Sequence, residues 1–391
     1  MECKVNKMVK KILMLSHKTP PVHGAAIVGD MVYDALVEGG FDIRFINLSS
    51  SSSIKEIGNV SYKKFILLTN MTYNFIRYII NFKPDIIYVT PSVAGSAFYK
   101  DFFFSTIAKI CRFFFSRNYR IIYHIQMRPF NSGYIRQKLL FKIFFKNIEL
   151  VFPSKVLLVD YSTSVICGNK VYAIPNVIGP ICKKQTALDQ AVKYDRLKEA
   201  DHVIKILYFG HLIESKGYKR ALNIAKTLFL QDNHKYQFHF SGEFGSGEDM
   251  NYFNKFVSDN NLNAAIFYDG SCAQKDKYNR FNANDIIIFP SYSEAYPLTI
   301  LEAFSIGMPV VATDTGANKE IIGLKYGNTV NFHGNEIKFI DEFVHHIISV
   351  IESWNKELSE ESIDRFHSNW NRNSFNSTLY SIMKEEYSFN D

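Results

Sequence analysis

Two glutamates mark the stretch of the chain that is best suited to bind a polar ligand. Glu294 and Glu302 follow the apolar run 286–289, which predicts a buried strand. Pro297 favours the first turn of a helix, because the amide that proline lacks would have no partner there, and Gly307 favours its end. Glu294 is therefore expected in the loop before this helix and Glu302 more than one turn inside it. Free amides at the helix start attract anionic or hydroxyl-rich ligands, so the two carboxylates should reach different parts of one extended ligand. A pair of solvated surface carboxylates is the alternative.

A lysine occupies a comparable junction earlier in the chain. A strand is expected at 205–210 and a helix from about Gly217, so Lys216 lies between them. In open α/β sheets, ligands bind beyond the carboxyl ends of the strands, where such loops converge. An ammonium group there can stabilise a diphosphate that gains negative charge as a bond to it breaks. A solvated surface lysine is the alternative.

The surrounding pattern predicts an α/β protein. Short apolar runs alternate with helical patterns, which is typical of βαβ units around a parallel sheet. Several runs are continuous rather than alternating, as expected when helices cover both faces of the sheet. Strands are expected at 11–17, 43–48, 85–91, 120–126, 150–153, 171–175, 205–210, 236–241, 266–269, 285–290, 309–313 and 328–331.

These strands form two series separated by a polar stretch, and 391 residues exceed what one hydrophobic core usually organises. We therefore predict two Rossmann-like domains that face each other across a cleft. The N-terminal domain spans 1–180, a linker spans 181–203, the second domain spans 204–372, and 373–391 forms a terminal segment.

Composition excludes several classes of protein. Apolar residues make up 47% of the chain and charged residues 21%, which excludes a disordered or fibrous protein. Five scattered cysteines without a C-x-x-C pair argue against a disulfide framework or a zinc site and favour a reducing compartment. No apolar run is long enough for a membrane-spanning helix or a signal peptide, so a soluble or peripheral protein is expected.

The run from Pro290 to Ala312, P-S-x-S-E-x-x-P-x-x-x-x-E-A-x-x-x-G-x-P-V-V-A, resembles the E-x7-E signature of GT-B glycosyltransferases of family 4. The resemblance is specific from Lys205 to Ile322 and weaker in the N-terminal half. It implies that Glu294 contacts the sugar of a nucleotide-sugar donor and that Glu302 contacts the ribose. It also implies backbone contacts with the sugar and phosphates at Ala295, Tyr296, Pro297 and Leu298.

The same resemblance covers the loop that carries Lys216. The family carries G-R-L-x-x-x-K-G there, with the arginine and the lysine both on the phosphates, whereas this chain has His211 in the arginine position. A neutral imidazole offers one donor against the fork of a guanidinium, so phosphate neutralisation should depend more on Lys216. Gly210 and Gly242 end neighbouring segments and would let a ligand approach the backbone.

Two positions in the N-terminal half extend the resemblance. Gly24, in the run Pro20-Pro21-Val22-His23-Gly24, matches a glycine-containing loop that approaches the donor phosphate and the acceptor. His124 ends the strand at 120–126 and matches a histidine that lies near the reacting sugar; a hydrogen-bonded structural histidine is the alternative. The final helix, about Ser374 to Tyr387, is implied to cross back onto the N-terminal domain.

Residues 99–150 combine aromatic side chains with an excess of positive charge. Ten basic residues stand against two acidic ones, Asp101 and Glu149. Much of the aromatic content must be core, and the remainder could form a basic face that docks on an anionic membrane surface. An ordinary solvated face is the alternative. Nucleic acid is not an expected partner, because no recognised binding fold accompanies the charge.

The resemblance predicts a retaining hexosyltransferase (EC 2.4) that uses a UDP- or GDP-sugar and needs neither a metal nor another cofactor. The expected acceptor is a glycan, in particular a lipid-linked one, in the biosynthesis of O-antigen, capsule or exopolysaccharide. The expected location is the cytoplasm, at the inner face of the plasma membrane. The alternatives are another GT-B activity, such as nucleotide-sugar epimerisation or hydrolysis, and a non-catalytic sugar-nucleotide-binding partner subunit, which the substitution at His211 favours.

Overall fold

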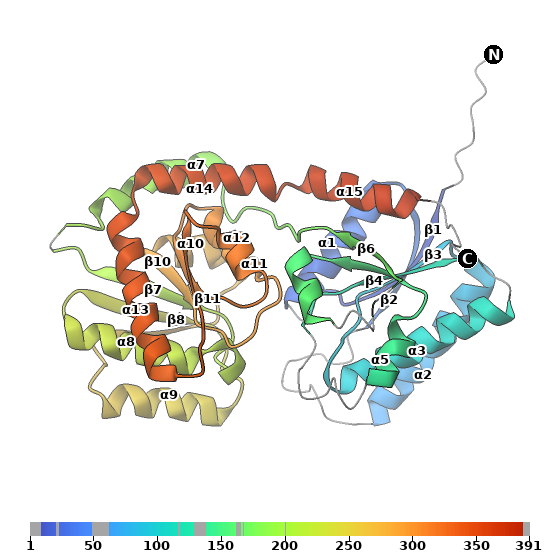
Figure 1. Ribbon diagram of the computed structural model, residues 1–391, viewed down its shortest axis with the longest axis horizontal. Helices are drawn as coiled ribbons and strands as arrows, with labels where there is room; N and C mark the ends of the chain where they lie inside the picture. The colour runs from blue at the N-terminus through green and yellow to red at the C-terminus, as the bar shows by residue number, and fades with distance from the viewer. Residues whose placement is uncertain are drawn as a thin grey trace, which may run out of the picture. The chain divides into compact units, whose positions relative to one another are not determined.

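The computed structural model describes residues 9–20, 23–48, 62–115, 118–128, 138–161, 166, 168–199 and 201–385. Contacts divide the chain into two compact units (Figure 1). The first contains the residues up to Asn176 together with those from Arg372 onward, and the second is Val177–Asn371. Each unit is built on a sheet of six strands, all of them parallel. The predicted α/β class and all twelve predicted strands are confirmed.

The first unit has the strand order β2-β1-β3-β4-β5-β6. Its strands are β1 (Lys11–Ser16), β2 (Asp42–Asn47), β3 (Ile86–Val89), β4 (Arg120–His124), β5 (Glu149–Phe152) and β6 (Lys170–Ala173). Its helices include α1 (Gly24–Glu38), α2 (Tyr62–Arg77), α3 (Gly95–Phe114), α5 (Lys138–Phe145) and α15 (Arg372–Lys384). A π-helical turn, η2 (Tyr78–Phe82), and a 3-10 helix, η3 (Lys155–Asp160), complete it. The strand order changes direction between β1 and β3, where ligands bind in sheets of this kind.

Aromatic side chains fill much of the core of this unit. Phe98 of α3 stacks on Phe141 of α5 with ring centroids 4.9 Å apart, and Phe144 packs against Tyr123 of β4 at 4.8 Å. All four side chains are buried. The prediction that much of the aromatic content of 99–150 belongs to the core is therefore confirmed.

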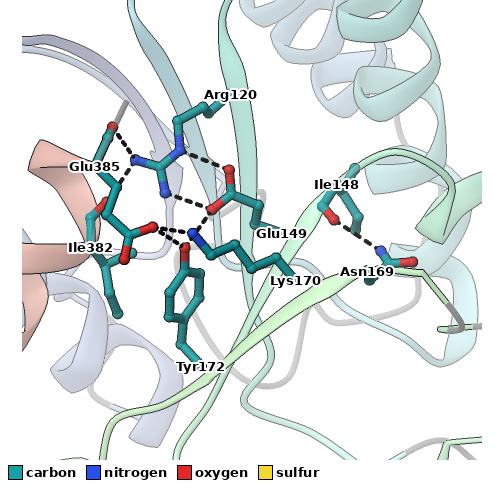
Figure 2. Close-up of polar contacts among 8 residues, drawn as sticks. All are labelled: Arg120, Ile148, Glu149, Asn169, Lys170, Tyr172, Ile382 and Glu385. Carbon is teal, nitrogen blue, oxygen red and sulfur yellow. Dashed lines mark hydrogen bonds and ion pairs between the residues drawn. The ribbon is translucent and has the colours of Figure 1, made fainter. Parts of the chain in front are cut away.

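The last helix, α15, is attached to the first unit at the start of its central strands (Figure 2). Arg120, at the beginning of β4, donates to the carbonyl oxygens of Ile382 at 2.6 Å and Glu385 at 3.1 Å, and pairs with both carboxylate oxygens of Glu149. Lys170 and Tyr172 of β6 bind the Glu385 carboxylate. A guanidinium at the C-terminal end of a helix complements its dipole, so this cluster explains why α15 packs here.

The second unit has the strand order β12-β11-β10-β7-β8-β9. Its strands are β7 (Ile204–Phe209), β8 (Tyr236–Ser241), β9 (Ile266–Gly270), β10 (Ile286–Phe289), β11 (Val310–Thr313) and β12 (Gly327–Val330). The order changes direction between β7 and β10, which run side by side with Ile287 opposite Leu207. The carboxyl ends of β7 and β10 are therefore the expected ligand site of this unit.

The helices of the second unit are α8 (Tyr218–Gln231), α9 (Gly247–Asp259), α10 (Lys277–Asn282), α11 (Leu298–Phe304), α12 (Asn318–Ile322), α13 (Glu336–Ser353) and α14 (Lys356–Asn369). Short 3-10 turns precede α8 and α10: η5 (Glu214–Lys216) and η6 (Gln274–Asp276). Helices α8 and α13 pack against each other, and their apolar faces join the buried side of the sheet in one hydrophobic core.

The stretch 181–203, expected as a linker, is folded in much of its length. It contains α7 (Lys184–Gln190) and the 3-10 helix η4 (Ala191–Arg196), and contacts assign it to the second unit. Tyr194 and Leu197 are buried in the core of that unit. Because this stretch contains many charged residues, its sequence did not indicate that two of its side chains are buried and anchor it.

Candidate active site

The loops after β7 and β10 bring Lys216 and Glu294 together. The Lys216 ammonium nitrogen lies 2.9 Å from each carboxylate oxygen of Glu294. The Glu294 side chain is 9% exposed and that of Lys216 is 38% exposed, so the ammonium faces solvent while the carboxylate is nearly buried. Ser291 adds a hydroxyl that donates to Glu294 Oε1 at 2.8 Å. An ammonium group has three donors, and this pairing accounts for two of them.

Backbone contacts hold these two loops in register. The Tyr292 amide donates to the Ser215 carbonyl oxygen at 3.0 Å. Gly217 has φ +75°, and a β-carbon there would come within 2.1 Å of the Pro290 carbonyl oxygen. Only glycine permits that approach at that backbone conformation. The close packing explains why Lys216 reaches Glu294, a contact that spacing alone does not predict.

A second approach by a glycine supports the backbone around Glu294. Gly316, with φ +58°, lies after β11, and a β-carbon there would meet the Glu294 carbonyl oxygen at 2.1 Å. The Ala317 amide donates to the Ala295 carbonyl oxygen at 2.9 Å. The loop that carries Glu294 is therefore packed on both sides by neighbouring loops.

Glu302 lies in α11 and has a different partner. Its Oε1 accepts from the Lys277 ammonium group at 2.5 Å, and both side chains are largely buried. Burial raises the pKa of Glu302, and Lys277 acts against that shift. The prediction that the two glutamates occupy separate places is consistent with this geometry, because each has its own lysine.

Lys277 and Ser291 are residues of the site that sequence reasoning missed. Lys277 begins α10, which leads into β10, whereas Glu302 lies on α11, which leads out of β10. The signal available in the sequence was that one helix precedes β10 and the other follows it. Each of these helices begins at the carboxyl ends of the parallel strands, so their first turns lie at the same end of the sheet. Ser291 stands in the quoted motif but carried no assigned role.

His211 and the two strand-end glycines lie in the loops after β7 and β8. The Leu212 amide donates to the Glu243 carbonyl oxygen at 2.8 Å, which pairs the two loops. A β-carbon on Gly242 would meet the Gly210 carbonyl oxygen at 1.8 Å, whereas one on Gly210 would meet no atom within 4 Å. Burial lowers the pKa of His211, while Glu243 acts against that shift and Lys216 adds to it.

Residues 295–298, which lead into α11, differ in their exposure to solvent. Pro297 is the residue immediately before the first helical residue, Leu298, one position earlier than the pattern predicts. Tyr296 is buried, and its hydroxyl accepts from Trp370 Nε1 at 2.7 Å. Its side chain therefore anchors the loop to the core, and only its backbone is available to a ligand. Ala295 and Pro297 are partly exposed.

In the first unit, His124 is fully buried at 0% exposure. Gln126 donates to its Nε2 at 2.6 Å, and its Nδ1 lies 2.6 Å from the Tyr88 hydroxyl. Burial lowers the pKa of His124 to about 3. Both ring nitrogens are hydrogen-bonded within the protein, so neither is offered to a sugar. This is the environment expected of a structural histidine, the alternative given above.

Gly24 is the first residue of α1, which follows the loop after β1. A β-carbon there would meet no atom within 4 Å, so the packing of the protein does not itself require glycine. Gly29, one turn further along α1, is the position where a β-carbon would meet the His17 carbonyl oxygen at 2.0 Å. Pro21 and Val22 of the quoted run lie outside the described residues.

The site at β7 and β10 offers carboxylates, ammonium groups and hydroxyls to a ligand. Within the described ranges, no group of three or more His, Cys, Asp or Glu side chains could hold a metal ion. In that same part of the chain, no helix has the length and apolar character needed to cross a membrane. The carboxylates of the site can accept hydrogen bonds from hydroxyl groups, and its ammonium groups can pair with an anion.

Comparisons with known proteins agree with this geometry. Residues 189–365 match the family model of glycosyl transferases group 1. A Klebsiella pneumoniae protein described as an uncharacterized 41.2 kDa protein in the cps region is 26% identical over 81% of this chain and 80% of its own length. The putative colanic acid biosynthesis glycosyl transferase WcaC of Escherichia coli is 27% identical over 34% of this chain and 30% of its own.

A solved structure defines the fold. HepE of Anabaena, in complex with UDP and glucose, superposes with a TM-score of 0.66 at 13% identity and covers 96% of this chain and 100% of its own. The chain therefore has the GT-B fold, and its residues 189–365 match a glycosyl transferase family model, which agrees with the resemblance seen in the E-x7-E run. Membership of family 4 and the retaining mechanism stay predictions. Together these findings support a glycosyltransferase, an enzyme of class EC 2.4.

Proposed function

We propose that this chain is a retaining hexosyltransferase that moves a sugar from a nucleotide-diphosphate sugar to a glycan acceptor. The proposal rests on two lysine–glutamate contacts near the carboxyl end of β10. One of them joins the loop after β7 to the loop after β10. Lys216 pairs with Glu294 and Lys277 with Glu302 at the strand ends where the strand order changes direction. Ligands in α/β sheets bind at that point.

Each side chain has a role in this proposal. The Glu294 carboxylate accepts hydrogen bonds from sugar hydroxyls, and Lys216 directs its third donor toward the diphosphate as the glycosidic bond breaks. Glu302 accepts from the ribose of the nucleotide. Backbone groups at Gly210, Gly242 and Ala295–Leu298 line the path. Since His211 stands where the family has an arginine, the diphosphate depends more on Lys216 for its positive charge.

The donor and acceptor classes rest on the comparisons. The structure of HepE was solved with UDP and glucose, which supports a UDP-sugar, with a GDP-sugar as the other candidate. The relative WcaC is named for colanic acid biosynthesis. The proposed acceptor is accordingly a growing surface polysaccharide of a bacterium, held on a lipid carrier, and the proposed reaction requires no metal.

The proposal is tested by incubating the protein with UDP-glucose or a GDP-sugar, with and without a lipid-linked glycan, in the presence of EDTA. Transfer that requires the acceptor and retains the anomeric configuration is expected. Epimerised or hydrolysed donor without acceptor would instead favour the other GT-B activities. No binding of any sugar nucleotide would contradict the proposal, because a donor at a hundred times its dissociation constant should stabilise the protein by about 2.7 kcal/mol.

Replacing Lys277 by methionine is expected to make donor binding sensitive to pH. Burial raises the pKa of Glu302 and Lys277 opposes that shift, so the pKa of Glu302 should rise further in Lys277→Met. The protonated carboxyl accepts ribose hydrogen bonds poorly. The variant should therefore lose affinity for UDP as the pH falls, and should do so at higher pH than the wild type. Lys275→Met, an exposed lysine two residues earlier, is the control. Equal pH profiles for all three proteins, measured by calorimetry, would contradict the role of Lys277.

The proposal includes a place at the inner face of the plasma membrane, supported by an apolar surface on the first unit. Lys109 donates to the carbonyl oxygens of Ile143 and Phe144 and thereby joins α3 to the end of α5. Around this junction the exposed apolar side chains are Ile110, Phe113, Phe114, Phe115, Leu139 and Ile143. Lys142 on α5 and Lys146, the residue directly after this helix, are exposed and suit anionic headgroups.

The structure changes the balance of charge that the sequence predicts for this surface. Lys109 and Arg112 donate to carbonyl oxygens of the α5 end, Arg120 pairs with Glu149, and Arg128 pairs with Asp160. These basic groups act within the protein, so apolar contact rather than charge should dominate membrane binding.

Replacing Phe113 and Phe114 by serine together is expected to weaken binding to phosphatidylglycerol-containing vesicles. The two side chains are 79% and 74% exposed, so the change removes apolar surface without disturbing the core. A loss of about tenfold or more is expected from the burial of two aromatic side chains, measured by vesicle sedimentation. Leu324→Ser serves as control, because it removes an apolar side chain of the second unit that is 96% exposed. Unchanged sedimentation of the double variant would contradict this surface.

A further inference from the structure

Arg220, in the first turn of α8, has an environment unlike that of other basic residues near the site. Its side chain is 3% exposed. Its Nε and Nη2 atoms pair with the two carboxylate oxygens of Glu336 at 2.9 and 2.7 Å. Glu336 is the first residue of α13, where the helix N-terminus favours a negative charge. The guanidinium is thus held in one orientation by a second helix.

The faces of this guanidinium contact aromatic rings. Its central carbon lies 3.6 Å from the ring centroid of Tyr292, 4.3 Å from that of Phe339 and 4.5 Å from that of Phe332. Planar stacking of this kind is specific to arginine, because the compact ammonium of lysine cannot stack and form a forked ion pair at once. Arg220 is therefore matched in shape as well as in charge to its surroundings.

Arg220 also contacts the loop that leads to Glu294. Its Nη1 atom lies 3.5 Å from the Pro290 carbonyl oxygen, where β10 ends. Pro290 and Tyr292 flank Ser291, whose hydroxyl donates to Glu294 Oε1. Tyr292 is 42% exposed, and its ring lies against the guanidinium. One buried guanidinium thus contacts both residues that flank Ser291.

We propose that Arg220 is a positioning residue, which acts through Pro290 and Tyr292 to place Glu294 and Lys216 for the reaction. The inference deepens the proposed function, because the reaction it serves is sugar transfer from a nucleotide sugar. Arg220 touches no reacting atom. Its effect is to fix the segment 290–294 against α8. Lys216 and Gly217 are the two residues directly before this helix.

The test compares amide hydrogen exchange and kinetics in matched variants of the full chain. In Arg220→Met, the Tyr292 amide, which donates to the Ser215 carbonyl oxygen, should exchange about tenfold faster while the strands of the second unit exchange as before. With UDP-glucose, kcat should fall by about ten- to a hundredfold with little change in KM, because misplacement affects the reacting geometry more than binding.

Lys219→Met is the control, since Lys219 is the adjacent residue of the same helix and pairs with the exposed Glu214 instead. It should leave both readouts unchanged. Tyr292→Phe keeps the stacked ring and should behave as the wild type, whereas Tyr292→Ala should reproduce the loss in Arg220→Met. The tyrosine pair keeps the inference testable if Arg220→Met does not fold.

Uniformly faster exchange throughout the second unit would show that Arg220 only stabilises the fold, and would overturn the inference. So would wild-type exchange at Tyr292 in both Arg220→Met and Tyr292→Ala. The exchange experiment needs no ligand. If the wild type neither binds nor converts any sugar nucleotide, the proposed function fails, and the comparison of exchange rates still decides whether Arg220 positions the loop.

Discussion

Glu294→Ala is expected to reduce sugar transfer by about a hundredfold or more while the protein remains folded. Glu294 lies in a loop, so its loss opens no cavity in the core, and its partner Lys216 is already partly in solvent. The variant loses the carboxylate that is proposed to hold the sugar and that pairs with Lys216. The measurements are initial rates of transfer and the melting temperature.

The control for Glu294→Ala is Glu214→Ala, which removes an exposed carboxylate two residues before Lys216. It should transfer sugar at the wild-type rate. Normal turnover by Glu294→Ala would remove the assignment of the sugar contact. Unfolding of the variant would show instead that the contact with Lys216 is structural.

Lys216→Ala is expected to weaken donor binding and turnover together. In the proposed function the ammonium group faces a diphosphate in both the bound and the reacting state, so its loss should raise the dissociation constant of UDP-glucose and lower kcat. A charge-assisted hydrogen bond is worth about 1.5–3 kcal/mol, which corresponds to roughly a ten- to hundredfold effect on affinity. Calorimetry and steady-state kinetics measure the two quantities.

Lys219→Ala provides the matched control for Lys216→Ala, because it removes an ammonium group of the same helical region that pairs with Glu214. Unchanged affinity and turnover in Lys216→Ala would mean that another group neutralises the phosphates.

Much of the fold follows from local patterns. The strands β7 and β10 are continuous apolar runs bounded by polar loops, and a parallel sheet covered on both faces requires such runs. Their positions were therefore predictable within a few residues. The segment 181–203 was less so, because its two buried anchors, Tyr194 and Leu197, stand among charges that mask any periodicity.

Those residues of the site that belong to a sequence motif were predictable. Glu294, Glu302 and Lys216 were recognisable by type and spacing, but their partners depend on tertiary packing. Lys277 reaches Glu302 from another helix, and Arg220 reaches Tyr292 from α8. His124 shows the converse: its place at a strand end suggested a ligand contact, whereas burial and two hydrogen bonds give it a structural environment.

The central claim is tested most directly by a crystal structure of the protein with the sugar nucleotide that raises its melting temperature most. We expect the sugar within hydrogen-bond distance of Glu294, the ribose on Glu302 and the diphosphate beside Lys216. A nucleotide bound elsewhere, or bound with these three side chains directed away from it, would contradict the proposed function.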